Sequence, residues 1–202
     1  MARGADSLPP LLGDVDVTRL LRTVPPAHAI KGAFIGANAD AVRAAWDRIS
    51  LQLRAPPRAG KYLAFTDYPL SDHVLLADFA ARRLYPGVPT CESHRLLSRA
   101  TIDTFAKTTL GRVTLSLIAG PQSMLTKYQD IFNRMVTGPR VVVEVTGATS
   151  VTLTYRDYYS LKEAIVGVVE GAILACDLEP LVQLLGQGDG CFVANASWRP
   201  WA

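Results

Sequence analysis

The last third of this 202-residue chain constrains the fold most, because two β-hairpin patterns stand on either side of one apolar helical segment. Residues 140–145 and 150–155 are β-branched runs joined by a short Gly-Ala-Thr turn. Residues 180–185 and 191–198 are joined by a glycine-rich turn, which gives a second hairpin. Residues 161–176 separate the hairpins and are predicted to be helical. The sequence therefore predicts a four-stranded antiparallel sheet in the order β-β-α-β-β.

Helical periodicity dominates the first two-thirds of the chain, so the predicted fold class is α+β, with the helices first and the sheet last. The predicted helices cover residues 17–23, 38–53, 71–83, 90–105, 112–119 and 121–135. Asn38 or Asp40 is the expected N-cap of the second helix, and Ser71 is that of the third. Residues 112–119 also alternate like a strand, and we favour a helix there because the run leads directly into the next helix.

The composition predicts one folded domain. With 49% hydrophobic and 19% charged residues, the chain has the apolar content to build a core, which excludes a disordered chain. Proline and glycine are frequent in residues 1–23, which we interpret as an arm laid on a single α+β domain of residues 24–202. The most apolar stretch, residues 164–176, is interrupted by Glu170 and is shorter than the ~20 residues of a membrane span.

Cysteine usage and the N-terminus indicate a cytoplasmic protein. The three cysteines are an odd number, and each lies in a predicted helix or strand instead of a loop-rich disulfide scaffold. The first residues do not form a charged segment followed by an apolar one, which a secretory leader would need.

Charge and motifs argue against nucleic-acid binding and against catalysis. The net charge is only +3, and the basic clusters are small and scattered, unlike the concentrated stripe of a duplex-binding surface. The chain has no Gly-x-Ser-x-Gly sequence, and the adjacent Asp72 and His73 give no geometry for a proton relay. We therefore predict a protein that is not an enzyme.

Two short patterns resemble ligand sites but have simpler explanations. Cys91 and His94 are three residues apart on a predicted helix, which is half of a metal site, while His28 and His73 belong to distant elements. The glycines of residues 186–190 lead into a strand, whereas a phosphate-binding loop opens onto a helix N-terminus. The sequence thus predicts neither a metal nor a cofactor.

Aromatic and small residues mark two candidate binding regions. Tyr155 and Tyr159 are candidates for lining a ligand pocket, with Trp46 as a further wall if the helices pack over the sheet. The alternative is that these rings only seal a core edge. Gly167 and Gly171 give their helix a smooth stripe, although each glycine costs about 0.8–1 kcal/mol in a helix interior. Close packing on the sheet explains the stripe, and an interaction surface for a partner helix or a second copy is the alternative.

Three segments carry a resemblance to a known group of proteins. They are residues 24–34, the Leu-Gly-Arg step at residues 110–112, and residues 165–174 with the glycine-rich hairpin that ends at Trp198. In these segments the chain resembles an uncharacterised bacterial domain family. The C-terminal half of that family is similar to heme-nitric-oxide-binding, four-vinyl-reductase and TRAPP-subunit domains. The resemblance covers about residues 24–198 and implies a fold more strongly than an activity.

The resemblance raises heme binding, and the motif residues argue against it. The heme-nitric-oxide-binding domains hold heme with a Tyr-x-Ser-x-Arg motif on a strand and a histidine on the preceding helix. Here Tyr155 matches the tyrosine, but Asp157 replaces the serine and Tyr159 replaces the arginine. A carboxylate would repel the heme propionates. The preceding helix, residues 121–135, has no histidine, so we expect no heme, even though cysteine or tyrosine can also ligate heme iron.

The function that we predict is a non-enzymatic cytoplasmic sensor or adaptor domain. It would act through protein–protein contacts, as a homodimer or by docking a partner, and could hold a small apolar ligand beneath its helices. The low charge and the resemblance to TRAPP-type domains, which assemble with one another, motivate this prediction. The alternative is a heme- or metal-dependent gas or redox sensor, or an enzyme of unrecognised type.

Overall fold

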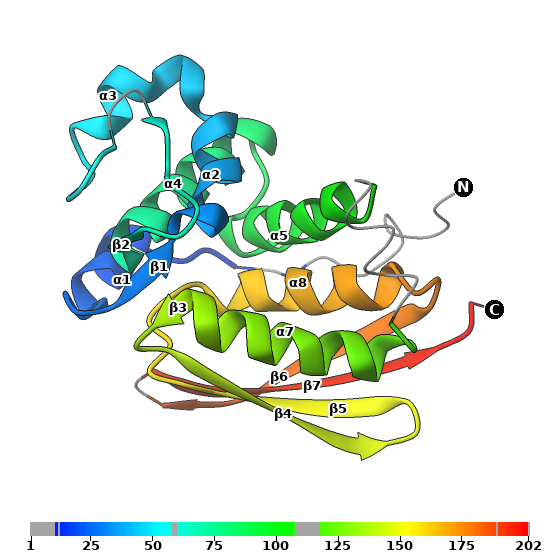
Figure 1. The fold of residues 1–202 in the computed structure, drawn as a ribbon. Coiled ribbons are helices and arrows are strands. Elements are labelled where there is room, and N and C mark those ends of the chain that lie inside the picture. Colours follow the sequence, from blue (N-terminus) through cyan, green and yellow to red (C-terminus); the bar gives the residue numbers. More distant parts are fainter. Residues whose placement is uncertain (1–10, 12, 58–59, 108–117, 189, 202) are drawn as a thin grey trace.

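The computed structural model describes residues 11, 13–57, 60–107, 118–188 and 190–201 of the chain (Figure 1). Its helices are α1 (Val17–Thr23), α2 (Gly32–Ala41), the 3-10 turn η2 (Arg43–Ala45), α3 (Trp46–Ser50), α4 (Leu70–Leu84), α5 (Thr90–Lys107), α7 (Pro121–Met135) and α8 (Lys162–Leu174). Its strands are β1 (Ala29–Lys31), β2 (Asp67–Pro69), β3 (Val136–Thr137), β4 (Arg140–Gly147), β5 (Ser150–Arg156), β6 (Glu179–Gly188) and β7 (Cys191–Arg199). None of the helices in these residues is long and apolar enough to cross a membrane.

The C-terminal strands form the predicted four-stranded sheet. Its order is β4-β5-β7-β6, and every neighbouring pair is antiparallel. The α+β class and the β-β-α-β-β order of residues 140–199 are therefore confirmed. Side chains alternate along the strands, so that Val151, Leu153 and Tyr155 of β5 are buried between partly exposed threonines. This period of two gives the sheet one core face and one outer face.

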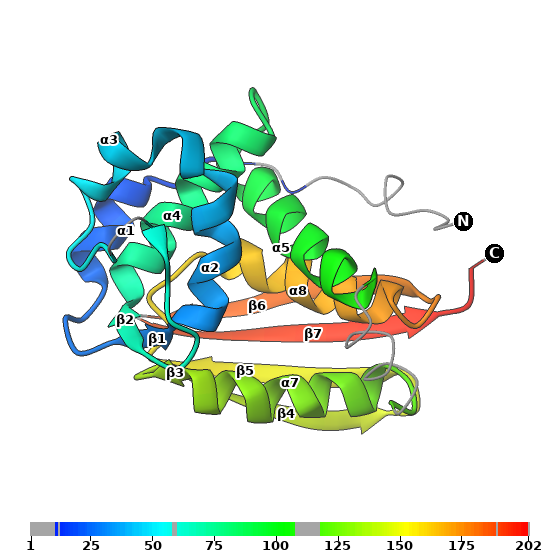
Figure 2. The ribbon, with the colours of Figure 1, turned by 45° about the horizontal axis from the view of Figure 1, so that its top comes forward.

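Helices cover only one face of this sheet. Figure 1 shows α7 and α8 lying along the same face, with α5 on the far side of α8 from the sheet. Figure 2 shows α2, α3 and α4 grouped near the N-terminal end of α5, beside the small strands β1 and β2. The helices of the first half thus form a layer on α8 and do not lie directly on the sheet. Among the described residues, no helix lies over the outer face of the sheet.

A small antiparallel sheet joins the helical layer to α7, and the sequence analysis did not predict it. Its order is β2-β1-β3, with Ile30 opposite Tyr68 on one side and Val136 on the other. These strands have only two or three residues, too few for an alternating pattern to be recognised. The sheet fixes the start of α4, because the backbone N–H of Leu70 donates to the carbonyl of His28 at 3.0 Å.

Two predicted helix starts are wrong. The helix expected from Asn38 or Asp40 is broken into α2, η2 and α3, because N–H groups at Val42 and Ala45 bond to carbonyls three residues back and tighten the chain there. Ser71 is not an N-cap, since α4 already begins after Pro69 and the buried hydroxyl of Ser71 has no hydrogen-bond partner.

The remaining helix predictions have two outcomes. The helices predicted at residues 17–23, 90–105, 121–135 and 161–176 are present within a few residues of the expected bounds. The helix predicted for residues 112–119 lies mostly outside the described residues, and Ile118 and Ala119, which are described, are not helical.

Candidate functional site

Aromatic side chains fill the contact between α7 and the four-stranded sheet. We call Tyr128, Phe132, Tyr155, Tyr158 and Phe192 the aromatic cluster. The ring of Tyr155 stacks on that of Phe192 with centroids 4.5 Å apart, and meets that of Phe132 edge-on at 5.9 Å. The Tyr155 hydroxyl donates to the Tyr128 hydroxyl at 3.1 Å. Tyr155, a predicted pocket residue, is thus fully buried and bonded within the protein.

The other predicted pocket residues lie apart from Tyr155. Tyr159 lies at the end of the sheet, where its ring is 5.7 Å from that of His28 and packs against Gly190. Trp46 lies on α3, where it meets Tyr62 edge-on at 6.2 Å. In Figures 1 and 2, α3 is at the end of the helical layer that is farthest from the sheet. The structure therefore does not gather Trp46, Tyr155 and Tyr159 around one space.

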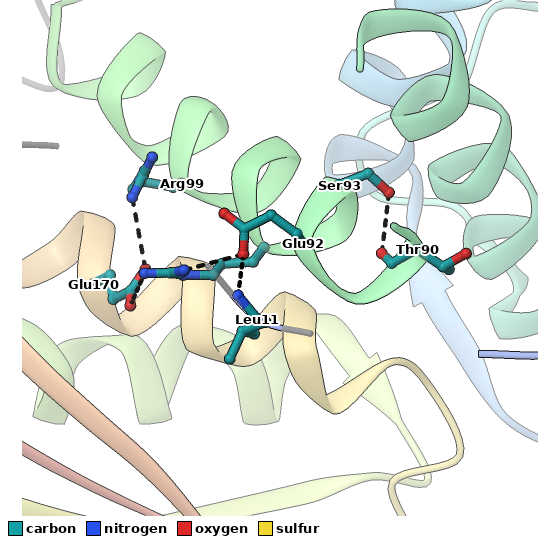
Figure 3. Close-up of polar contacts among 7 residues, drawn as sticks. Leu11, Thr90, Glu92, Ser93, Arg99 and Glu170 are labelled. Atoms are coloured by element: carbon teal, nitrogen blue, oxygen red, sulfur yellow. Dashed lines mark hydrogen bonds and ion pairs between the residues drawn. The ribbon is translucent and has the colours of Figure 1, made fainter. Parts of the chain in front are cut away.

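A buried ion network joins α5 to α8. The guanidinium of Arg95 on α5 makes two hydrogen bonds to the carboxylate of Glu170 on α8, from Nε at 2.7 Å and from a terminal nitrogen at 2.8 Å. The Arg95 side chain is 2% exposed and that of Glu170 is 6% exposed. The other terminal nitrogen of Arg95 donates to Glu92 at 3.0 Å, and Arg99 lies 3.9 Å from Glu170 (Figure 3).

The ionisation of Arg95 follows from these partners. Burial by itself lowers the pKa of a guanidinium, but hydrogen bonds and the charges of Glu170 and Glu92 outweigh it and raise the pKa of Arg95 above its ordinary value. Burial raises the pKa of Glu170, and the hydrogen bonds and charge of Arg95 offset part of that rise. Arg95 thus makes a bidentate contact from a charged guanidinium in the interior, the geometry that Arg is best suited to make.

The N-terminal arm ends on the same network. The backbone N–H of Leu11 donates to the Glu92 carboxylate at 2.6 Å, as Figure 3 shows. Two residues earlier, the N–H of Thr90 donates to the Asp14 carboxylate at 3.0 Å, so an acidic side chain of the arm caps the start of α5. The part of the arm that precedes α1 thus contacts the first turn of α5 through Leu11 and Asp14.

The two glycines of α8 make the close approach of α5 possible. A Cβ built on Gly167 would lie 2.0 Å from the carbonyl oxygen of Arg95, and one built on Gly171 would lie 2.8 Å from Cβ of Ile102. Both glycines are buried in this contact. The smooth stripe of α8 therefore faces a helix of the same chain, where the sequence analysis had favoured packing on the sheet.

Replacing Gly171 by leucine should lower the free energy of unfolding by roughly 1–3 kcal/mol, because the added side chain has to displace Ile102 and overpack the helix contact. Urea denaturation followed by circular dichroism measures the loss. The matched control is Gly36→Leu on α2, where a Cβ meets no atom within 4 Å. An unchanged midpoint for Gly171→Leu would mean that α5 and α8 do not pack as described.

Two histidines, His73 on α4 and His94 on α5, lie near enough to affect each other electrostatically. His94 is 1% exposed, and its Nε2 lies 3.4 Å from the Asp78 carboxylate, which also pairs with Arg82 at 2.9 Å. His73, one helix away, has a buried Nδ1 without a hydrogen-bond partner. Burial, and then the nearby His94, lower the pKa of His73 to about 4. His73 is therefore neutral at physiological pH.

Acid should destabilise the protein through His73. The unfolded chain binds a proton at this residue below about pH 6.5, whereas the folded chain does so only near pH 4, so the free energy of unfolding falls as the pH falls through this window. We expect a loss on the order of 2 kcal/mol. Thermal melts between pH 4 and 7 should show a shallower decline for His73→Gln than for the wild type. Parallel curves would contradict the prediction.

The structure separates Cys91 and His94, whose spacing resembles half of a metal site and for which no metal was predicted. Cys91 lies beside Glu163 of α8, and burial, followed by the Glu163 charge, raises the pKa of its thiol to about 11. His94 instead faces Asp78. Within the described part of the chain, no group of three His, Cys, Asp or Glu side chains could hold a metal ion.

Comparison with known proteins identifies the family. Residues 23–198 match the family described as "Protein of unknown function (DUF2378)". The chain belongs to this family. The match covers nearly the same residues as the resemblance seen in the sequence, residues 24–198. Among proteins with curated functions, no sequence matches this chain.

Solved structures similar to this family member are H-NOX domains. The H-NOX protein of S. oneidensis in its Fe(II)NO ligation state has a TM-score of 0.64 at 14% identity, over 84% of this chain and 99% of that one. The unliganded Fe(II) H-NOX protein of K. algicida gives 0.60 at 15% identity, over 84% and 97%. A mutant of the T. tengcongensis H-NOX gives 0.60 at 15% identity, over 84% and 98%. At these identities the likeness shows a shared fold, and the resemblance is confirmed for H-NOX, while its TRAPP and four-vinyl-reductase parts stay predictions.

The residues of α7 and of the adjoining strand do not fit a heme. α7 contains no histidine and no cysteine. Its inward phenol, Tyr128, accepts the hydrogen bond of Tyr155, and burial raises its pKa, which keeps the oxygen protonated and makes it a poor iron ligand. Tyr159, at the position expected for a cationic partner of propionates, packs on His28 instead.

Sequence reasoning missed the α5–α8 ion network. Arg95 and Glu170 are 75 positions apart, a distance over which no periodicity connects two residues. One signal was present, since Glu170 interrupts the most apolar stretch of the chain. A carboxylate inside an otherwise apolar helix is seldom fully buried unless it is paired, which predicts a basic partner without naming it.

Proposed function

We propose that this chain is a sensor-type domain, which binds a small ligand and transmits the binding through the α5–α8 contact. The match to H-NOX domains over 84% of the chain carries the proposal. The neighbour from S. oneidensis is in an Fe(II)NO ligation state, and that from K. algicida is unliganded, so the fold supports ligand-dependent states in those proteins. Transfer of that role to this chain rests on the fold.

The α5–α8 contact is a suitable transmission element. It joins the N-terminal helical layer to the helices on the sheet, and its charged core has discrete partners that either pair or separate. A ligand that shifts α5 would have to break or re-form the Arg95–Glu170 pair. A packed contact of this kind has two arrangements and does not deform continuously.

Native mass spectrometry of the purified full chain tests the proposal. We expect a surplus mass that is lost under denaturing conditions, and faster hydrogen–deuterium exchange in α5 and α8 after the retained molecule is stripped. A bare chain mass, together with unchanged exchange in these helices, would contradict a sensor role.

A heme-dependent gas sensor is the second candidate. The Fe(II) states of the similar structures support it, because heme iron is the group that binds nitric oxide in such a fold. The donor set of α7 argues against it in this chain. A Soret band in the purified protein would favour this candidate over a sensor of another ligand.

Protein docking or self-association without catalysis is also retained as a proposal. Its support is three exposed apolar side chains on the edge strands of the sheet: Val142 on β4 and Leu181 and Leu185 on β6 are 45–59% exposed. Light scattering over a hundredfold concentration range tests self-association. A monomeric mass throughout, with no partner recovered in a pull-down, would contradict it.

A further inference from the structure

The aromatic cluster leaves no room for a planar ligand between α7 and β5. A flat molecule between two rings needs about 7 Å between them, twice the contact distance of about 3.5 Å. The rings of Phe132 on α7 and Tyr155 on β5 are 5.9 Å apart at 89°. The Tyr155–Tyr128 hydrogen bond closes the same contact at 3.1 Å. These residues already pack on one another.

Each of the three histidines of the chain is held within the protein. His94 faces Asp78 inside the α4–α5 contact, and His73 is placed beside it. His28 is the imidazole nearest to the aromatic end of the sheet, with its ring against Tyr159. A Cβ on Gly138 would lie 2.3–2.6 Å from three atoms of the His28 ring, so that edge of the ring lies directly on the backbone. His28 keeps one unpartnered nitrogen, Nδ1, and is the residue to test.

The thiols are no better placed as iron ligands. Cys91 lies beside an acidic side chain, Glu163, which disfavours a thiolate. Cys176 follows the end of α8, and burial raises its pKa as well. Cys191 is exposed at the start of β7, on an edge of the aromatic region. No described helix facing the cluster offers a thiolate or an imidazole.

We propose that this chain is a heme-independent domain with the H-NOX fold, in which the aromatic cluster between α7 and the sheet takes the place of a bound porphyrin. The proposal rests on the proposed sensor function and makes it more specific, because it excludes heme as the ligand. The input of the sensor then has to be a molecule other than a gas bound to heme iron.

Hemin titration of the full chain tests this proposal. The protein is produced with added iron and 5-aminolevulinate, purified, and titrated with hemin in the ferric state and after reduction with dithionite, followed by nitric oxide. We expect no saturable 1:1 Soret shift and no response of the spectrum to nitric oxide. The melting temperature should also stay unchanged in excess hemin, whereas a specific ligand far above its Kd raises it by several degrees. An H-NOX domain treated in the same way is the positive control.

A saturable 1:1 Soret shift in the wild type would overturn the proposal. The variants His28→Ala and Tyr128→Phe then identify the ligand, because loss of the band in one of them names the donor. If both variants keep the Soret band, another residue binds the heme, and the proposal is overturned in that case as well. The two proposals fail separately: a chain that binds hemin removes only this one, and a chain that retains neither hemin nor any other molecule removes only the sensor role.

Discussion

Glu170→Ala should lower the free energy of unfolding by about 3–5 kcal/mol, the usual cost of removing one partner of a buried ion pair. The variant removes the bidentate partner of the Arg95 guanidinium, which is 2% exposed, and leaves its contact with Glu92 in place. Losing this carboxylate is expensive because little water reaches the guanidinium to replace it. Urea denaturation of the wild type and the variant measures the difference.

The chain offers a matched control for this experiment. Arg199 and Glu179 form the same bidentate geometry, at 2.6 and 3.1 Å, with the Arg199 side chain 74% exposed. Glu179→Ala should cost far less than Glu170→Ala, because water replaces the lost partner. Equal losses at residues 170 and 179 would show that Arg95 is solvated in the folded chain.

A double replacement separates the pair from its packing. Arg95→Met combined with Glu170→Leu removes both charges and keeps apolar volume in the α5–α8 contact. Such replacements of a buried ion pair are often neutral or stabilising, so the double variant should recover a large part of the loss. If it is as unstable as Glu170→Ala, the hydrogen bond of Leu11 to Glu92, or another contact of the network, carries the energy instead.

Gly167→Ala should destabilise the protein by at least about 2 kcal/mol, although alanine is the better helix former. The new Cβ would lie 2.0 Å from the backbone oxygen of Arg95, and a backbone atom cannot rotate away as the end of a side chain can. α5 and α8 would therefore have to move apart, which also lengthens the Arg95–Glu170 hydrogen bonds. Thermal and urea unfolding both measure the loss.

The opposite sign is expected at a glycine without this contact. Gly36 lies inside α2, and a Cβ there meets no atom within 4 Å. Gly36→Ala should stabilise the protein by about 0.5–1 kcal/mol through helix propensity alone. If Gly167→Ala behaved like Gly36→Ala, α5 would not lie on α8 as closely as the structure has it.

The sheet could be predicted because its signal is local. The turns and β-branched runs of residues 140–155 and 180–198 lie within a few residues of their partners, so chain order alone gives the antiparallel pairing. The helix break at Val42 could not be predicted in this way. Val42, Ile49 and Leu53 are buried as their spacing requires, but a tightened turn buries the same face as a continuous helix, so periodicity does not distinguish them.

The sequence singled out some residues of the candidate site but did not indicate what they contact. Tyr155 and Gly171 were recognised as unusual residues, yet their partners, Tyr128 and Ile102, come from other elements and depend on how the helices cross. The sequence analysis expected the stripe that contains Gly167 to contact the sheet or a partner. In the structure Gly167 faces Arg95, because α5 occupies that side of α8. Contacts between distant segments depend on tertiary packing, for which a single sequence has no periodic signal.

The separation between Arg95 and Glu170 also bears on how the chain is made. Glu170 follows Arg95 by 75 residues, which at a synthesis rate of about 5–20 residues per second takes roughly 4–15 s. During that interval α5 has emerged with its guanidinium and its surface for α8, but α8 does not yet exist. The face of α5 that packs on α8 therefore stays uncovered until α8 has been made.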